Sequence, residues 1–124
     1  MIQLDTSFLI RALLPDSAEA NRFRQWLEER ESVRISALAW AEFQCGPVSS
    51  NVIAVAERLL GEPVPFAGPE AALSAKLFNE AGRRRGTLVD CMIAATAIVS
   101  EESLATSNPK DFARFEKFGL AIAT

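Results

Sequence analysis

The 124-residue sequence contains no histidine, no tyrosine and only two cysteines. Without histidine, Ser-His-Asp and Cys-His catalysis and the usual zinc sites are excluded. Cys45 and Cys91 lie far apart, so there is no C-x-x-C pair for a redox dithiol or a zinc knuckle. We expect both to be small buried side chains within helices. Acid–base chemistry near neutral pH must therefore come from carboxylates, lysine or a bound metal ion.

Long apolar runs are also missing. None approaches the roughly 18–20 residues that cross a bilayer, and the first ten residues include Asp5 but no basic segment of a signal peptide. We therefore expect a cytoplasmic protein with no membrane partner, formed by one domain over residues 1–124. The net charge of -3 argues against broad nonspecific binding of nucleic acid, but it leaves room for a local basic strip.

Short strand-like runs alternate with helical ones along the chain. Strands are expected at 1–4, 32–36, 64–67, 103–107 and 120–123, and helices at 7–14, 18–30, 37–45, 50–60, 69–81, 88–99 and 108–118. This alternation predicts an α/β fold with a mostly parallel sheet between helices on both faces. Such sheets bind ligands beyond the carboxyl ends of their strands.

Four acidic residues occupy positions from which they could meet at that edge. Asp5 ends the first strand, Glu42 lies on the helix after the second, and Asp111 begins the helix after residues 103–107. Asp90 heads an otherwise apolar helix, "LVDCMIAATAIV". Clustered carboxylates repel one another unless protons or cations compensate them. Without histidine, the natural ligand is Mg²⁺ or Mn²⁺, which can activate water and stabilise a phosphodiester leaving group.

Helix capping is the alternative explanation. The segments Thr87–Asp90 and Asn108–Asp111 place an acid at the third helical position, and Asp16–Glu19 fits the same pattern with no chemistry implied. Asp5 could likewise cap the helix that follows it. Glu42 fits this explanation poorly, because it lies among apolar residues on a helix with no other charge.

Four segments resemble, in order, the signature segments of PIN domains. They are "LDTSFLI" at the start, "SALAWAEF" near 40, "LVDCMIAATA" near 90 and "LATSNPKDF" near 108. The VapC-like toxin ribonucleases of toxin–antitoxin pairs are the most similar, and residues 47–86 carry no matching motif. The resemblance implies a three-layer α/β/α PIN fold and a metal-dependent endoribonuclease that acts as a type II toxin.

The resemblance also implies roles for individual residues. Asp5, Glu42, Asp90 and Asp111 match the acidic quartet that holds Mg²⁺ or Mn²⁺. Asp5 would be the central ligand, and Glu42 would bind metal or act as general base. Four further residues match the family's small polar positions, where they support the acids or the scissile phosphate: Thr6, Ser7, Ser107 and Asn108.

The basic run Arg83, Arg84 and Arg85 precedes Asp90 by a short loop. It could bind RNA phosphates beside the cleft that the four acids are expected to form. Alternatively, it could be a solvated loop at the carboxyl end of a helix, where cations are favourable. Apolar residues on the early helices, including Leu9, Leu13 and Phe43, could exceed what one core needs. The resemblance implies a homodimer and a cognate antitoxin protein as partners.

Three other functions compete with the toxin interpretation. A housekeeping PIN nuclease that processes RNA would carry the same acids. A catalytically silent PIN-like binding module would lack one or more of them, and all four are present. Receiver-like and phosphatase-like α/β domains also gather acids at strand ends. The haloacid-type phosphatases, however, carry D-x-D-G-T where this chain has "DTSFL".

Overall fold

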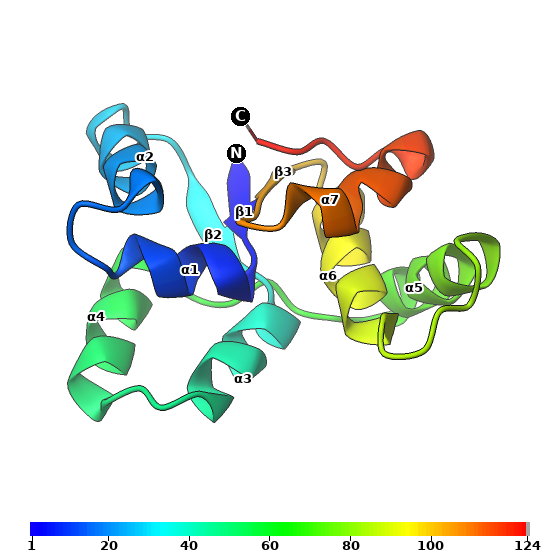
Figure 1. Cartoon of the computed structure of the whole chain (residues 1–124), viewed down its shortest axis with the longest axis horizontal. Coiled ribbons are helices and arrows are strands. Elements are labelled where there is room, and N and C mark those ends of the chain that lie inside the picture. Colours follow the sequence, from blue (N-terminus) through cyan, green and yellow to red (C-terminus); the bar gives the residue numbers. More distant parts are fainter. Residues whose placement is uncertain (124) are drawn as a thin grey trace.

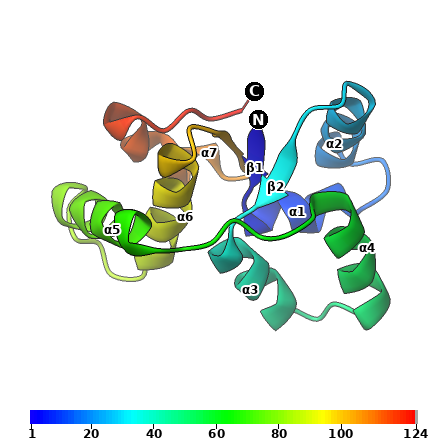
Figure 2. The ribbon, with the colours of Figure 1, turned by 180° about the vertical axis from the view of Figure 1, so that it is seen from behind.

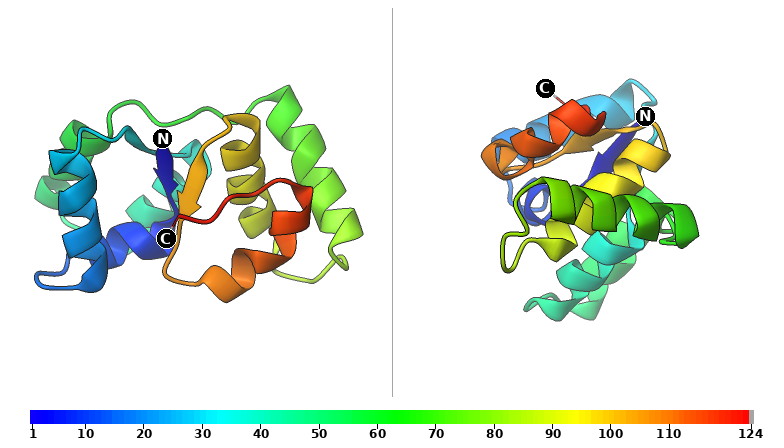
Figure 3. Two further views of the ribbon diagram at one scale, coloured as in Figure 1. Left: turned by 90° about the horizontal axis from the view of Figure 1, so that it is seen from above. Right: turned by 90° about the vertical axis from the view of Figure 1, so that its right-hand side faces the viewer.

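Three short parallel strands form the centre of the molecule. In the computed structural model, which describes residues 1–123, they are β1 (Ile2–Leu4), β2 (Val33–Ile35) and β3 (Ser103–Ala105). The strand order is β2-β1-β3, so the strand nearest the amino terminus lies in the middle. Figure 3 shows β1 and β3 side by side and pointing the same way. All three carboxyl ends therefore meet at one edge of the sheet.

Helices lie on both sides of this sheet, as the sequence predicts. They are α1 (Thr6–Ala12), α2 (Ala18–Glu28), α3 (Ala37–Cys45), α4 (Ser50–Leu60), α5 (Gly68–Glu80), α6 (Leu88–Val99) and α7 (Pro109–Phe112). Figure 1 shows α1, α2 and α4 on one side of the strands and α5, α6 and α7 on the other. Seen from behind in Figure 2, the segment between α4 and α5 crosses from one side to the other. No helix within residues 1–123 is long and apolar enough to span a membrane.

The two expected outer strands are each reduced to a single bridge, which corrects the prediction. Val64 bridges to Ser36 beside β2, and Ile122 bridges to Leu104 in β3. Pro63 and Pro65 flank Val64 and have no N–H to donate, so a longer ladder cannot form there. The expected helix 108–118 also divides, because α7 is followed by a 3₁₀ helix over Ala113–Phe118.

The core joins the helices to the sheet. Phe8, Phe43 and Phe115 are almost completely buried, and the rings of Phe8 and Trp26 stack 5.5 Å apart, which fastens α1 to α2. Leu9 belongs to the same core and Leu13 packs against it. The named residues Leu9, Leu13 and Phe43 are therefore used by the core, whereas the neighbouring Ile10 and Leu14 are each 50% exposed. Each such buried side chain contributes about 1.5–3 kcal/mol relative to exposure.

The cysteines differ from each other, which corrects part of the expectation for them. Cys91 is buried on α6, whereas Cys45 ends α3 at the surface.

A buried polar group ties the three strands together. Glu102, immediately before β3, accepts hydrogen bonds from Gln3 Nε2 at 2.9 Å and from Arg34 Nε and Nη2 at 3.3 and 2.5 Å. The Glu102 side chain is 1% exposed and that of Arg34 is 41% exposed. Burial raises the pKa of Glu102, but the hydrogen bonds and the charge of Arg34 outweigh it and hold that pKa below its usual value. Glu102 is therefore ionised at neutral pH and links β1 to β2.

Candidate metal and phosphodiester site

All four predicted acids line one cleft at the carboxyl edge of the sheet. The cleft has a volume of about 260 Å³, and its walls come from α1, α3, α6 and the start of α7. Its lining also contains three of the small polar residues that the sequence singled out: Thr6, Ser7 and Asn108. Segments far apart in the sequence are thus brought together because three of the four follow parallel strands that end at the same edge.

Asp5 is the most strongly held of the four acids. It caps α1, since its Oδ1 accepts from the Phe8 N–H at 2.8 Å and from the Ser7 hydroxyl at 2.8 Å. Its Oδ2 accepts from the Thr106 hydroxyl at 2.5 Å. The residue is only 4% exposed. The Asp5 carboxylate therefore caps α1 and lines the cleft at the same time, so the two explanations given for this residue are compatible.

Glu42 is exposed at the mouth of the cleft and is not a plain solvent-facing helix residue. Its Oε1 accepts from the Thr6 hydroxyl at 2.8 Å, and the same hydroxyl lies 3.2 Å from the Ala39 carbonyl oxygen. Thr6 therefore orients the Glu42 carboxylate across the gap between α1 and α3.

Asp90 and Asp111 occupy the third helical positions of α6 and α7, yet neither forms the predicted capping box. Thr87 makes no side-chain cap bond to α6, and its hydroxyl instead donates to the Arg84 carbonyl at 2.6 Å. Asn108 makes no such bond to α7 either. In α2 the cap is Ser17, which accepts from the Ala20 N–H, because Asp16 adopts a left-handed conformation with φ 64°.

The cleft is unfavourable for negative charge as it stands. Burial raises the pKa of Asp5 and the charge of Glu42 adds to that rise, although hydrogen bonds from Thr106, Phe8 and Ser7 oppose it. Burial also raises the pKa of Asp90; Arg114 opposes that rise, and the charges of the other three acids reinforce it. A bound cation would relieve both effects.

The donor set fits a hard divalent cation. Carboxylate and hydroxyl oxygens from α1 and its cap, α3, α6 and α7 surround the cleft, with no sulfur or imidazole among the lining residues. Within residues 1–123, no three acidic or cysteine side chains stand close enough to form a ready-made metal cage. Mg²⁺ commonly keeps several waters and uses only one or two carboxylates directly, so a wider ring of acids suits it.

Two residues that support the site were missed by the sequence analysis. Thr106 holds Asp5, and the available signal was a hydroxyl directly after a strand at the carboxyl edge of the sheet. Glu19 accepts from the Ser107 hydroxyl at 2.7 Å, so this hydroxyl reaches toward α2, and within residues 1–123 it forms no hydrogen bond with Asp111. The Ser107 N–H donates to Ser7 Oγ at 3.2 Å, and Ser7 in turn donates to Asp5, so Glu19 and Ser107 are linked to the residues that hold Asp5.

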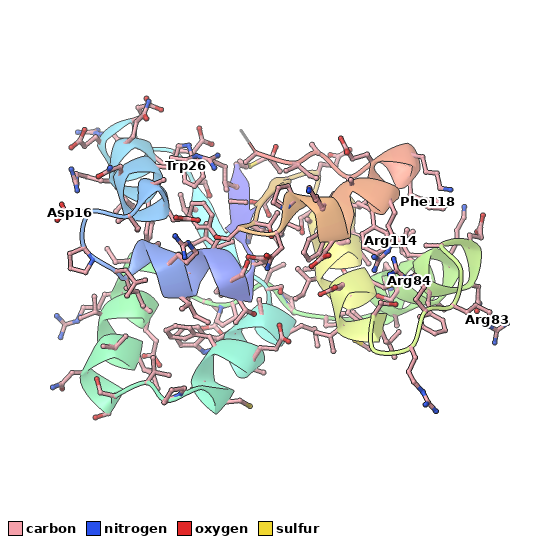
Figure 4. The ribbon with its side chains drawn as sticks, viewed as in Figure 1. Asp16, Trp26, Arg83, Arg84, Arg114 and Phe118 are labelled. Carbon is pink, nitrogen blue, oxygen red and sulfur yellow. The ribbon has the colours of Figure 1, made fainter. Side chains whose placement is uncertain are left out.

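The arginine run does not line the cleft. Arg83, Arg84 and Arg85 are all exposed on the loop between α5 and α6, and none is among the lining residues. Figure 4 shows Arg83 at the outer end of that loop, pointing away from the strands. Arg114 is the cation whose charge acts on Asp90, and its guanidinium stacks 4.5 Å from the centre of the Phe115 ring.

Known proteins agree with this architecture. Among solved structures, FitAcB from Neisseria gonorrhoeae is 26% identical with a TM-score of 0.73, covering 100% of this chain and 97% of that one. VapBC2 from Rickettsia felis, bound to a DNA fragment from its promoter, is 22% identical with a TM-score of 0.79, at coverages of 99% and 98%. A toxin–antitoxin complex from Klebsiella pneumoniae is 25% identical with a TM-score of 0.68, at 91% of each chain.

No curated protein matches the chain. The family model described as PIN domain, however, matches residues 2–118, which include all three strands and the four cleft acids. The three structures named above share the fold of this chain, and the one from Klebsiella pneumoniae is a toxin–antitoxin complex. The chain belongs to the PIN domain family.

Proposed function

We propose that this chain is a metal-dependent endoribonuclease that acts in the cytoplasm as the toxin of a type II toxin–antitoxin pair. The observation that carries the proposal is the convergence of Asp5, Glu42, Asp90 and Asp111 on one cleft. Bound Mg²⁺ or Mn²⁺ would supply activation of water and neutralisation of charge on the leaving oxygen of the RNA phosphodiester.

The residues of the chain have distinct roles in this proposal. Asp5, fixed by three hydrogen-bond donors, would be the central ligand, with Asp90 and Asp111 beside it and some of these acids acting through metal-bound water. Glu42 is exposed at the mouth and oriented by Thr6, so it can accept the proton of the attacking water or bind metal. Asn108 lines the same cleft and can donate its amide to the scissile phosphate.

Two protein partners belong to the proposal. The similarity to the toxin–antitoxin complex from Klebsiella pneumoniae supports a cognate antitoxin. A homodimer is supported by exposed apolar side chains, including Ile10 and Leu14, each 50% exposed, and Val55 and Leu59 on α4. Such side chains in a group usually mark an interaction surface.

The test pairs RNA cleavage with growth. Wild type and the variants Asp5→Asn and Asp90→Asn are purified free of antitoxin and incubated with labelled total RNA in Mg²⁺, Mn²⁺ or EDTA. Growth arrest on induction is scored in parallel, and circular dichroism confirms folding. We expect cleavage and arrest by wild type only, both abolished in the variants, with cleavage stopped by EDTA. Folded variants that behave like wild type would overturn the proposal.

The same experiment separates the alternatives. A housekeeping nuclease would cut RNA without arresting growth, and a silent binding module would do neither. Relief of arrest by co-expression of a short protein encoded beside this gene would identify the toxin.

A further inference from the structure

A second cavity adjoins the acidic cleft and is not explained by the four acids. It has a volume of about 480 Å³ and lies between α1, α2 and the loop after β3. Its lining comprises Ser7, Ile10, Arg11, Glu19, Ser107 and Asn108. Ser7 and Asn108 also line the acidic cleft, so the two cavities share a wall. A polymer strand that is bound in the cleft can therefore continue into this cavity.

Arg11 is held in this cavity through one edge of its guanidinium. Its Nε donates to Glu19 Oε2 at 3.0 Å, and the same oxygen accepts from the Ser107 hydroxyl at 2.7 Å. The Ser107 backbone is in turn fixed to Ser7, the residue that donates to Asp5. The guanidinium is thus connected by a continuous series of hydrogen bonds to the central acid of the cleft.

The other edge of the guanidinium is free. The Arg11 side chain is 54% exposed while that of Glu19 is 14% exposed, and neither Nη atom of Arg11 donates to a residue in the described part of the chain. A half-exposed ion pair of this kind contributes little to stability. The ion pair instead orients the Arg11 guanidinium. Glu19 binds the Nε edge, so the two Nη atoms keep parallel N–H groups, a geometry that matches two oxygens of a phosphate.

We propose that this cavity receives the nucleotide next to the scissile bond and that Arg11 binds its phosphate, with Glu19 as a positioning residue. The inference rests on the proposed function, which places the scissile phosphate in the acidic cleft. The neighbouring phosphate of the same strand must then leave through an adjoining opening. The cavity with Arg11 is such an opening, and it shares Ser7 and Asn108 with the cleft.

The test measures RNA binding without cleavage. A labelled single-stranded RNA oligomer is titrated with the full chain in EDTA, in an Asp90→Asn background that does not consume the probe, and fluorescence anisotropy gives the affinity at several salt concentrations. Arg11→Gln is expected to weaken binding about tenfold and to reduce the slope of log affinity against log salt by about 0.7, the value for one lost phosphate contact on a single strand. The matched control is Arg24→Gln, an exposed arginine on α2 outside both cavities, expected to stay within twofold.

Glu19→Gln tests the positioning role separately. It keeps the shape of the side chain and weakens its hold on Arg11 by removing the carboxylate charge, so we expect a smaller loss than for Arg11→Gln and no further loss in the double variant. Additive losses in the double variant would overturn the role of Glu19. If the parent binds RNA but Arg11→Gln and Arg24→Gln bind alike, the phosphate contact is wrong while the nuclease proposal stands. RNA binding that depends on Arg11, together with wild type that cuts no RNA, would instead refute the nuclease and retain the contact.

Discussion

Replacement of Glu102 by alanine is the sharpest test of how the sheet is held together. Glu102 lies just before β3 and accepts hydrogen bonds from Gln3 on β1 and from Arg34 on β2. Alanine removes the acceptor for both partners at once. Gln3 is completely buried, and its Oε1 already has no donor among the described residues, so its whole amide is left without a partner.

The size of the expected loss of stability follows from the different exposure of Gln3 and Arg34. Arg34 is 41% exposed and can turn its guanidinium to water, so its loss is small, whereas Gln3 cannot reach solvent. An unpaired buried amide costs about 1–3 kcal/mol, and the lost side-chain methylene adds about 0.8 kcal/mol. We therefore expect Glu102→Ala to lower the free energy of unfolding by about 2–4 kcal/mol, a large part of the stability of a small protein.

Urea denaturation at pH 7, followed by tryptophan fluorescence, measures this loss. Glu116→Ala, which truncates an exposed carboxylate, is the matched control and should change stability by less than about 0.5 kcal/mol. The pKa of Glu102 is lowered in the folded protein, so its contribution is present above the ordinary glutamate pKa of about 4.3 and is lost as pH falls through the lowered value. A loss below about 1 kcal/mol at pH 7 would refute the reasoning.

Three further predictions concern the cleft. Because the pKa of Asp90 is raised in the folded protein, its charge is unfavourable at pH 7, and Asp90→Asn should raise the melting temperature of the metal-free protein. The same variant should abolish any rise in melting temperature that Mn²⁺ causes in the wild type. An unchanged response to Mn²⁺ in scanning fluorimetry contradicts this prediction. Mn²⁺ affinity measured by calorimetry should fall on acidification through the raised pKa values of Asp5 and Asp90, beginning above the ordinary aspartate value of about 3.9, and constant affinity from pH 7 to 4 argues against the site. Thr106→Val should weaken Mn²⁺ binding about tenfold with an unchanged circular dichroism spectrum, and Thr106→Ser should restore it.

Much of the fold could be predicted from local signals. The bounds of α3, α4 and α6 agree with the expected ranges, because serine caps precede α3 and α4 and glycines follow them, while α6 is a long apolar run. The lengths of the two outer strands were overestimated, because Val64 and Ile122 lie within apolar runs that resemble strands. A local sequence pattern does not show how many backbone partners a segment will find at the edge of a sheet.

The place of three of the acids at one edge could be expected from the sequence, since residues after parallel strands meet there, whereas Asp90 follows α5 and reaches the same cleft from the start of α6. The residues that hold them were harder to find. Glu19 matched a helix-cap pattern, and only the tertiary structure brings it to Ser107, 88 residues away in sequence. Arg83, Arg84 and Arg85 stood out by composition, but none of them lines the cleft, whereas a single arginine on α1 lines the neighbouring cavity.

The hydrogen bond between Asp5 and Thr106 spans 101 residues of sequence. During synthesis on a ribosome, the central strand and its acid are made first, but β3, Thr106 and Asp111 are made only after α6. Until then β1 can pair only with β2, Oδ2 of Asp5 lacks its Thr106 donor, and the part of the cleft wall that α7 supplies is missing. A nascent chain that still lacks β3 and α7 therefore carries an incomplete site, so the assembly of this site depends on elements that are made long after its central acid.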